Sequence, residues 1–196
     1  RSNENFNFNG NAWYKILPNL TVKIKAGLNS RTLEENSFYN SLTSRGSALS
    51  TANTKGVNGG IRFTNYKTWV NENTLTYRPT LKKGQSLTGL IGWTIQGDIM
   101  KRFGLSGEYV PNELLGLYGI DEGTPGANTA TISENYLMSY LGRVDYSLND
   151  KYLLTASLRS DGSSKFAKGN RWSYFPSAAF AWKLKNEKFM NSLNFI

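Results

Sequence analysis

Alternation of apolar and polar residues with a period of two constrains this chain more than any other feature. In the run LTVKIKAGL, residues 20–28, the even positions are apolar, whereas the odd positions carry Thr, Lys, Lys and Gly. Such alternation is typical of a β-strand whose two faces meet different surroundings. Apolar repeats at helical spacing are nearly absent. The sequence therefore predicts an all-β chain.

Seven runs of this kind follow one another, most of about ten to thirteen residues, which is longer than the five or six usual in soluble sheets. They occupy residues 6–16, 20–28, 65–79, 86–96, 136–148, 152–160 and 172–184. Short connections near 18–19, 82–85 and 149–151 alternate with long ones near 31–60, 98–134 and 161–171. Because this segregation of loop lengths is typical of outer-membrane barrels, we predict a segment of an antiparallel, up-and-down transmembrane β-barrel.

The spacing of aromatic residues agrees with this prediction. Trp172 and Trp182 lie ten residues apart on one face of the last run. At ~3.3 Å per residue the separation is roughly 33 Å, and a strand tilt of about 40° reduces it to roughly 25 Å, the height of an apolar membrane band. Tyr136 and Tyr146 repeat the spacing, whereas Phe175 interrupts the alternation on the opposite face.

The composition excludes several kinds of chemistry. The 196 residues include no Cys and no His, which removes thiol nucleophiles, disulfides, His-based triads and His metal ligands. We expect no catalytic, cofactor-binding or metal site, and no enzymatic activity. The net charge of +9 is spread along the chain, so we expect no nucleic-acid partner.

Two local features carry their own predictions. The loop segment PNELLGLYG, residues 111–119, predicts one or two helical turns, with Leu114, Leu117 and Tyr118 packing the loop onto itself. Pro176 lies within the last run and lacks a backbone donor, so we expect a bulge or irregularity there.

The end of the chain resembles a known family. It carries an R-x-DGSS-x-F stretch, then F-P-S, then a Trp and a Glu-x-Phe, which together resemble the SusC/RagA family of TonB-linked outer-membrane transporters. The match is strong over residues 134–190 and weaker back to about residue 69, and Lys165 stands where the family often has Arg. The matching residues are Arg159, Asp161, Gly162, Ser163, Ser164, Phe166, Phe175, Pro176, Ser177 and Trp182, followed by Glu187 and Phe189.

The resemblance implies that residues 1–196 are part of one TonB-dependent receptor β-barrel domain of about 22 strands. The plug domain, the signal peptide and the remaining strands are then expected outside this sequence, since seven strands cannot close such a barrel. The resemblance also implies a multi-pass protein of the outer membrane of a Gram-negative bacterium. This protein would import large nutrients, oligosaccharides or peptides, with energy coupled through TonB and a SusD-like surface lipoprotein as a lid. Its partners would be the rest of the barrel and plug, that lipoprotein, TonB, outer-membrane lipid and the substrate, with no cofactor.

For the motif residues we favour a structural role over substrate contact. Arg159 and Asp161 are two apart, so they share a face and are expected to pair. Residues Phe166, Phe175 and Pro176 are expected to shape the loop and the barrel wall. Candidates for contact with substrate or lid lie in the long loops, where packing within the loop competes with such contact: Phe38, Tyr39, Tyr109 and Tyr118.

Three alternatives remain open from the sequence. A passive porin or structural barrel would show the same alternation without the family motif. A soluble all-β carbohydrate-binding module would have shorter strands and polar outward faces. An outer-membrane enzyme would need catalytic residues from elsewhere, because this chain has no His. Burial of Val22, Ile24, Leu154 and Phe180 beneath a second layer would contradict the transport interpretation.

Overall fold

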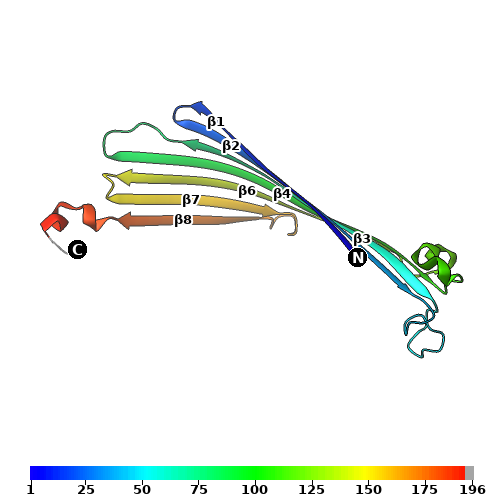
Figure 1. The fold of residues 1–196 in the computed structure, drawn as a ribbon. Helices are drawn as coiled ribbons and strands as arrows, with labels where there is room; N and C mark the ends of the chain where they lie inside the picture. Colours follow the sequence, from blue (N-terminus) through cyan, green and yellow to red (C-terminus); the bar gives the residue numbers. More distant parts are fainter. Residues whose placement is uncertain (193–196) are drawn as a thin grey trace. The chain divides into compact units, whose positions relative to one another are not determined.

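Seven long strands follow one another across a single antiparallel sheet in the computed structural model, which describes residues 1–192 (Figure 1). The strand order is β1-β2-β3-β4-β6-β7-β8, and the short β5 pairs with the end of β4. The strands are Ser2–Leu17 (β1), Leu20–Tyr39 (β2), Asn58–Tyr77 (β3), Gln85–Glu108 (β4), Thr124–Pro125 (β5), Thr129–Leu148 (β6), Tyr152–Ser163 (β7) and Trp172–Trp182 (β8). This confirms the predicted all-β, up-and-down antiparallel arrangement with seven main strands.

Contacts between neighbouring strands define two faces of the sheet. Lys25 Nζ lies 3.2 Å from Glu72 Oε2, and Thr68 Oγ1 donates a hydrogen bond to Asp98 Oδ1 at 2.8 Å. The face that holds these residues, called the polar face below, carries the odd-numbered residues of β1, β2, β6, β7 and β8 and the even-numbered residues of β3 and β4. The remaining strand residues form the apolar face.

The apolar face is not covered by a second sheet or by helices in the described part of the chain. On this face Ile24, Leu154 and Phe180 are 47%, 49% and 66% exposed, and Val22 is half-buried. The burial that would have contradicted the transport interpretation is therefore not observed. No helical segment among residues 1–192 is both long and apolar enough to cross a membrane.

Most strands are longer than the sequence predicts, although β8 ends two residues earlier, at Trp182. β2, β3 and β6 each contain 20 residues and β4 contains 24. Alternation underestimates them because polar residues continue onto the apolar face, as at Ser30, Thr32 and Glu34, while the backbone pairing continues. The long connections shrink to residues 40–57, 109–128 and 164–171, and the last is little longer than the connection 78–84.

The prediction of a bulge at Pro176 is wrong on the β7 side. The register runs without interruption through Leu158↔Pro176. The flanking hydrogen bonds, Ser163 N to Arg171 O and Lys183 N to Lys151 O, place odd-numbered β8 residues in the hydrogen-bonded pairs. Pro176 is even-numbered, so its nitrogen faces the other edge of β8 and the β7 ladder loses no donor.

The helical prediction in the second long loop is confirmed with different bounds. A 3₁₀ segment (η1) runs from Glu113 to Glu122 and is kinked at Gly116, where φ is 56°. Two of the three residues expected to pack the loop do not do so, because Leu114 and Tyr118 are 94% and 91% exposed. Val110 and Ile120 are buried instead. Two further 3₁₀ segments, Leu184–Asn186 (η2) and Lys188–Ser192 (η3), follow β8.

The chain divides into two compact units. The long-loop unit comprises Arg1–Phe8, Leu28–Thr68 and Asp98–Glu134. The short-turn unit comprises Asn9–Gly27, Trp69–Gly97 and the chain from Asn135 onward. Strands β1 to β4 and β6 therefore contribute to both units, whereas β7 and β8 belong to the short-turn unit alone.

Candidate functional site

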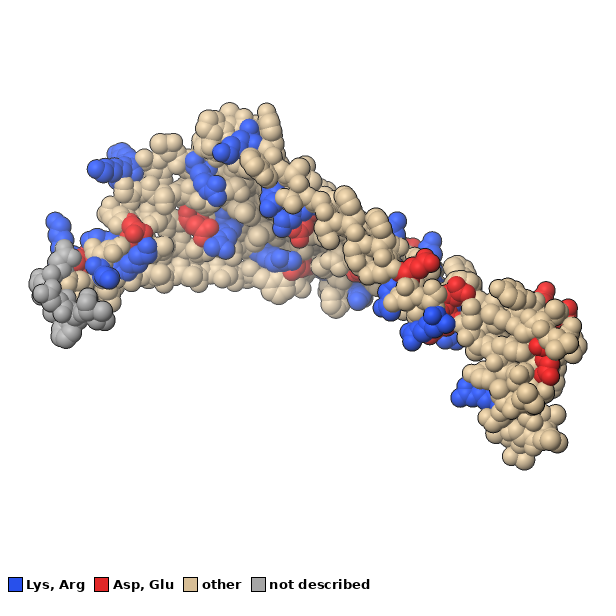
Figure 2. All heavy atoms as spheres, in the orientation of Figure 1, with Lys and Arg blue, Asp and Glu red and all other residues tan. Residues whose placement is uncertain are grey.

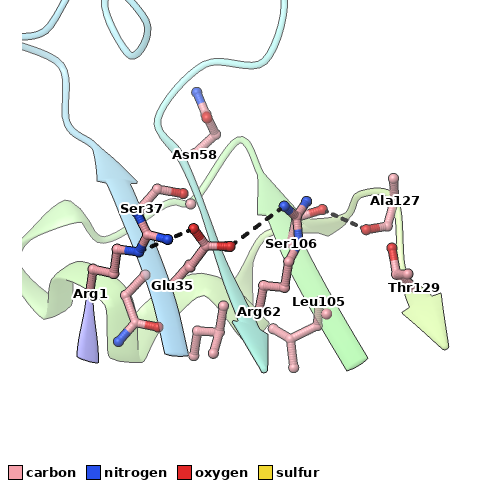
Figure 3. Close-up of a pocket in the computed structure, with 14 residues that line it drawn as sticks. Arg1, Glu35, Ser37, Asn58, Arg62, Leu105, Ser106, Ala127 and Thr129 are labelled. Carbon is pink, nitrogen blue, oxygen red and sulfur yellow. Dashed lines mark hydrogen bonds and ion pairs between the residues drawn. The ribbon is translucent and has the colours of Figure 1, made fainter. Parts of the chain in front are cut away.

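A pocket of about 560 Å³ opens on the polar face of the long-loop unit (Figure 3). Arg1 comes from the start of the chain, Glu35 from β2, Arg62 from β3 and Ser106 from β4. Pairing of β1 to β4 brings these residues together although they are far apart in the sequence. Gly60 and Gly104 lie on the same face and add no side chain, which leaves the space between the charged residues open.

The electrostatics of the pocket centre on one carboxylate between two guanidinium groups. Glu35 Oε1 lies 3.6 Å from Arg1 Nε, and Glu35 Oε2 lies 4.0 Å from Arg62 Nη1. Both arginine side chains remain more than half exposed, so most of their donors are available to another acceptor. The pocket therefore has excess positive charge and suits a ligand that carries carboxylates or other oxygen acceptors.

Hydrogen bonds hold the edges of this pocket in place. Ser106 Oγ donates to the Ala127 carbonyl at 3.0 Å, and the Gly126 N–H donates to the Ser106 carbonyl at 2.8 Å. Asn58 Nδ2 donates to the Arg45 carbonyl at 2.8 Å, which ties the first long loop to β3. The pocket is thus built on paired strands with its loops anchored beside it.

The polar face continues through the short-turn unit as a series of paired charges. Arg143 Nη2 lies 2.9 Å from Asp145 Oδ1, and Thr155 Oγ1 donates to the same carboxylate at 2.7 Å. Arg159 Nε donates to both carboxylate oxygens of Asp161, at 2.8 and 2.9 Å, as their shared face predicts. These pairs make a hydrophilic surface without burying an isolated charge.

The motif residues that begin the last long connection lie at one end of β7. Arg159 Nη2 reaches Ser139 Oγ on β6 at 3.3 Å. A Cβ on Gly162 would come within 2.9 Å of three indole atoms of Trp172, so only glycine accommodates the indole at this position. Ser163 N–H donates to the Arg171 carbonyl at 3.0 Å.

Aromatic contacts complete this end of β7. Trp172 stacks on Tyr140 with 5.8 Å between ring centroids. Ser164 is joined to Tyr136 twice, through its N–H to the Tyr136 carbonyl at 2.9 Å and from the Tyr136 N–H to its Oγ at 2.8 Å. These contacts account for the small residues of the DGSS stretch.

The last motif residues form a cluster at the other end of β7. Glu187 accepts hydrogen bonds from Lys151 Nζ at 2.7 Å, from Tyr152 Oη at 2.7 Å and from Trp182 Nε1 at 3.2 Å. The bond from Lys151, followed by that from Tyr152, lowers the pKa of Glu187 to about 2. Trp182 also stacks on Tyr152 at 6.2 Å. This cluster fixes the chain as it leaves β8.

Several motif side chains form no ring stack or side-chain hydrogen bond within residues 1–192, among them Phe166, Phe175, Ser177 and Phe189. Phe166 and Phe175 are 59% and 52% exposed. Phe175 lies on the polar face, as the sequence predicts, and Ser177 pairs with Ser157 on that face. Phe175 and Ser177 therefore lie on the polar face of β8, and Phe166 lies exposed in the connection before this strand.

Two of the four loop candidates, Phe38 and Tyr39, lie in the last residues of β2 rather than in a loop as expected. Arg45 of the first long loop lies over the Tyr39 ring at 5.2 Å and donates to its hydroxyl at 2.9 Å. Tyr109 of the second long loop donates through Oη to the Thr54 carbonyl of the first, at 2.6 Å. Phe38 is half-buried beside Gly59, while Tyr118 is 91% exposed.

Sequence reasoning missed the pocket charges and a second group of exposed loop residues. Ser41 bonds the Glu113 carboxylate through its N–H and hydroxyl, at 2.7 and 2.8 Å, which joins the two long loops and lowers the pKa of Glu113. Leu42 and Leu114 follow these two residues and are 90% and 94% exposed. For Leu42 the available signal was a bulky apolar residue inside an otherwise polar loop, whereas Leu114 lies in an apolar stretch where packing was expected. Within residues 1–192 no group of three or more acidic side chains has the arrangement of a metal site.

Comparisons with known proteins agree with these observations, although no family model matches the chain. TonB-dependent receptor P39 of Formosa agariphila is 32% identical over 183 residues, which is 93% of this chain and 17% of the relative. TonB-dependent receptor SusC of Bacteroides thetaiotaomicron is 52% identical over 66 residues, 34% of this chain and 7% of the relative. The chain therefore spans less than a fifth of the length of these relatives.

A solved structure supports the fold. The sheet resembles part of the RagAB peptide transporter with a TM-score of 0.78 at 22% identity, covering 96% of this chain and 20% of that chain. The alternating sheet, the motif at β7 and β8 and the similar proteins all indicate the same family. The chain belongs to the SusC/RagA-like TonB-dependent receptors, of which it represents a segment of the β-sheet.

Proposed function

We propose that residues 1–196 form part of the wall of one barrel domain in the outer membrane of a Gram-negative bacterium. The apolar face would contact hydrocarbon and the polar face would line an aqueous lumen. One observation carries this proposal: the apolar face of the short-turn unit has no Asp, Glu, Lys or Arg in its strands. The polar face of the same unit carries Lys15, Lys23, Lys25, Glu72, Arg143, Asp145, Arg159 and Asp161.

The whole receptor would import large hydrophilic nutrients through this lumen. Family membership supports energy coupling through TonB, a plug and the remaining strands in the rest of the protein, and a SusD-like lipoprotein lid. Oligosaccharides and peptides both fit a polar lumen. Peptides are favoured, because the exposed Arg1 and Arg62 suit carboxylates and because a structurally similar protein is a peptide transporter.

The motif and loop residues have distinct roles in this proposal. Arg159, Asp161 and Gly162 shape the wall and its loop, and Trp182 fixes the exit from β8. Phe38, Tyr39 and Tyr109 hold the long loops together, whereas the exposed Tyr118 contacts the lid or the substrate.

Uptake by the full receptor tests the proposal. We expect import of a labelled peptide mixture to stop when TonB is deleted. We expect Arg62→Ala to raise the half-saturating peptide concentration several-fold, because it removes a cation from the pocket. Lys67→Ala is the matched control, since Lys67 lies on the same strand but on the opposite face, and it should leave uptake unchanged.

Two results would contradict specific parts of this proposal. Import that persists without TonB would favour a passive porin. Equal effects of Arg62→Ala and Lys67→Ala would show that the pocket does not contact the substrate.

A further inference from the structure

A second hollow, of about 560 Å³, lies on the apolar face of the short-turn unit. Gly89, Gly142 and Ala156 form its floor on three neighbouring strands. The walls are the apolar side chains of Leu75, Tyr77, Ile91, Val144 and Leu158. It is separate from the polar pocket, which opens on the other face and belongs to the long-loop unit.

The hollow is empty of the chain's own side chains. A Cβ on Gly142 would meet nothing within 4 Å, and a Cβ on Gly89 would meet only the Tyr77 carbonyl, at 4.0 Å. Ile91 is 68% exposed and Leu158 is 52% exposed beside it. Gly142 pairs with Leu158 and Ala156 pairs with Val144, so small and large residues face each other across β6 and β7. The small residues on three neighbouring strands thus leave a slot with apolar walls, which suits a flexible hydrocarbon chain.

Two basic residues without an ion pair lie beyond one end of this hollow. They are Lys82 and Lys83, in the connection from β3 to β4. Within residues 1–192 neither of them has an ion pair. Arg78 of the same connection is not counted with them, because its N–H donates to the Asn19 carbonyl at 2.8 Å and so continues the β3 ladder with the parity of the polar face. The acids of the neighbouring segments are already engaged, Asp150 with Lys183 at 2.5 Å and Glu187 with Lys151 at 2.7 Å. Figure 2 shows Lys and Arg side chains over the short-turn ends of the strands.

The distance between hollow and basic residues matches the dimensions of a lipid. Gly89 is four residues into β4 from Gln85, and Val144 is five residues before Asn149, about 13 and 16 Å along the strands. A strand tilt of about 40° reduces these to roughly 10 and 13 Å across the membrane, and half of a barrel's apolar band is about 13 Å. The connections 78–84 and 149–151 are also joined by the bond from Asn149 N to the Gly84 carbonyl, at 2.5 Å.

We propose that this hollow binds an acyl chain of an anionic phospholipid, whose phosphate contacts Lys82 and Lys83. The inference rests on the proposed membrane orientation of the apolar face. The lipid belongs to the leaflet at the short turns, which is the periplasmic leaflet of an outer-membrane barrel. Apolar burial supplies the affinity for a tail, and the two lysines supply the preference for an anionic headgroup.

Lipid binding to the full receptor tests this proposal. The receptor is placed in phosphatidylcholine nanodiscs, and bound phosphatidylglycerol is titrated and counted by native mass spectrometry. We expect Lys82→Gln and Lys83→Gln to weaken phosphatidylglycerol binding by about fivefold for each charge removed. The control variants Lys165→Gln and Lys168→Gln, in the connection 164–171, should leave it unchanged.

Variants that fill the apolar hollow with a larger side chain provide an independent test. Ala156→Leu and Gly142→Leu should each abolish the retained lipid, whereas Ala12→Leu, on the apolar face of β1, should not. Equal retention of phosphatidylglycerol and phosphatidylcholine by the native receptor would overturn the proposal, as would unchanged binding in the slot variants. Failure of the membrane orientation itself would look different, because the receptor would then not enter nanodiscs at all.

Discussion

The long-loop unit and the short-turn unit share five strands, yet their apolar faces differ in chemistry. In the strands of the short-turn unit this face carries no charged residue, whereas in the long-loop unit it carries Glu4, Glu34, Lys67, Lys101 and Glu134. Large apolar residues such as Phe63 and Phe103 remain on the charged part, where they are 45% and 56% exposed. Large apolar residues therefore continue to alternate with polar ones along the strands even where the apolar face carries charges.

This difference shows where the proposed membrane contact ends. A charged side chain is costly in hydrocarbon and inexpensive in water, so the first charges on the apolar face mark the border. The border falls within continuous strands, near residues 8, 27, 68, 97 and 134. In the proposed orientation, the strands of the short-turn unit would lie in hydrocarbon and those of the long-loop unit, which carry the polar pocket, would lie in water.

The largest effect is expected from placing a charge on each side of this border. Ile24→Arg in the short-turn unit should destabilise the receptor by about 2–4 kcal/mol, because it puts a cation into hydrocarbon. Ile132→Arg in the long-loop unit should cost only about 0–1 kcal/mol. Ile132 lies on the same face as Ile24, and the two side chains are similarly exposed, Ile132 at 60% and Ile24 at 47%. Urea unfolding of the full receptor from vesicles measures both values. Similar costs for the two variants would remove the distinction between the units.

A smaller effect is expected at two glycines of the apolar face within the short-turn unit. Gly162→Ala should cost about 1–3 kcal/mol, because the added methyl displaces Trp172 from its stack on Tyr140. Gly142→Ala should instead be neutral or stabilise by up to about 1 kcal/mol, since nothing lies near the added methyl and alanine has less freedom in the unfolded chain. The same unfolding assay compares them. A neutral Gly162→Ala would mean that the indole has room to move.

Face chemistry was predictable from the sequence because a strand fixes it locally. The alternation gave the strand positions, the shared face of Arg159 and Asp161, and the opposite orientation of Phe175. Each of these depends only on the parity of positions within one run. Strand ends were less predictable, because backbone pairing continues where the side-chain pattern stops.

The pocket could not be predicted because it depends on register between strands. Arg1, Glu35 and Arg62 meet only when three strands are aligned, and a shift of one residue would move any of them to the other face. Pro176 shows the same limit, since its tolerance depends on which edge of β8 its nitrogen faces. Loop packing was also out of reach, since Leu114 is 94% exposed where packing was expected, two residues before the kink at Gly116.

The smallest effect is expected from acid, and it also differs between the units. The pKa of Glu187 is lowered to about 2, so its bonds to Lys151 and Tyr152 stabilise the fold fully above the unfolded pKa of about 4.5. That stabilisation is lost as the pH falls from about 4.5 toward 2. Glu113 in the long-loop unit has a lowered pKa through Ser41 alone, without a cation.

Glutamine variants of these two carboxylates measure the difference. The gap in unfolding midpoint between the native receptor and Glu187→Gln should be greatest at pH 7 and should close as the pH approaches 2. For Glu113→Gln the difference in unfolding midpoint should be smaller at every pH. The main effect of this variant should be faster proteolysis of the loop 40–57, because Ser41 loses its charged acceptor. A pH-independent gap for Glu187→Gln would show that the variant acts through packing rather than through charge. Measuring both variants across the same pH series therefore distinguishes Glu187, which is paired with a cation after β8, from Glu113, which is held only by the neutral donors of Ser41.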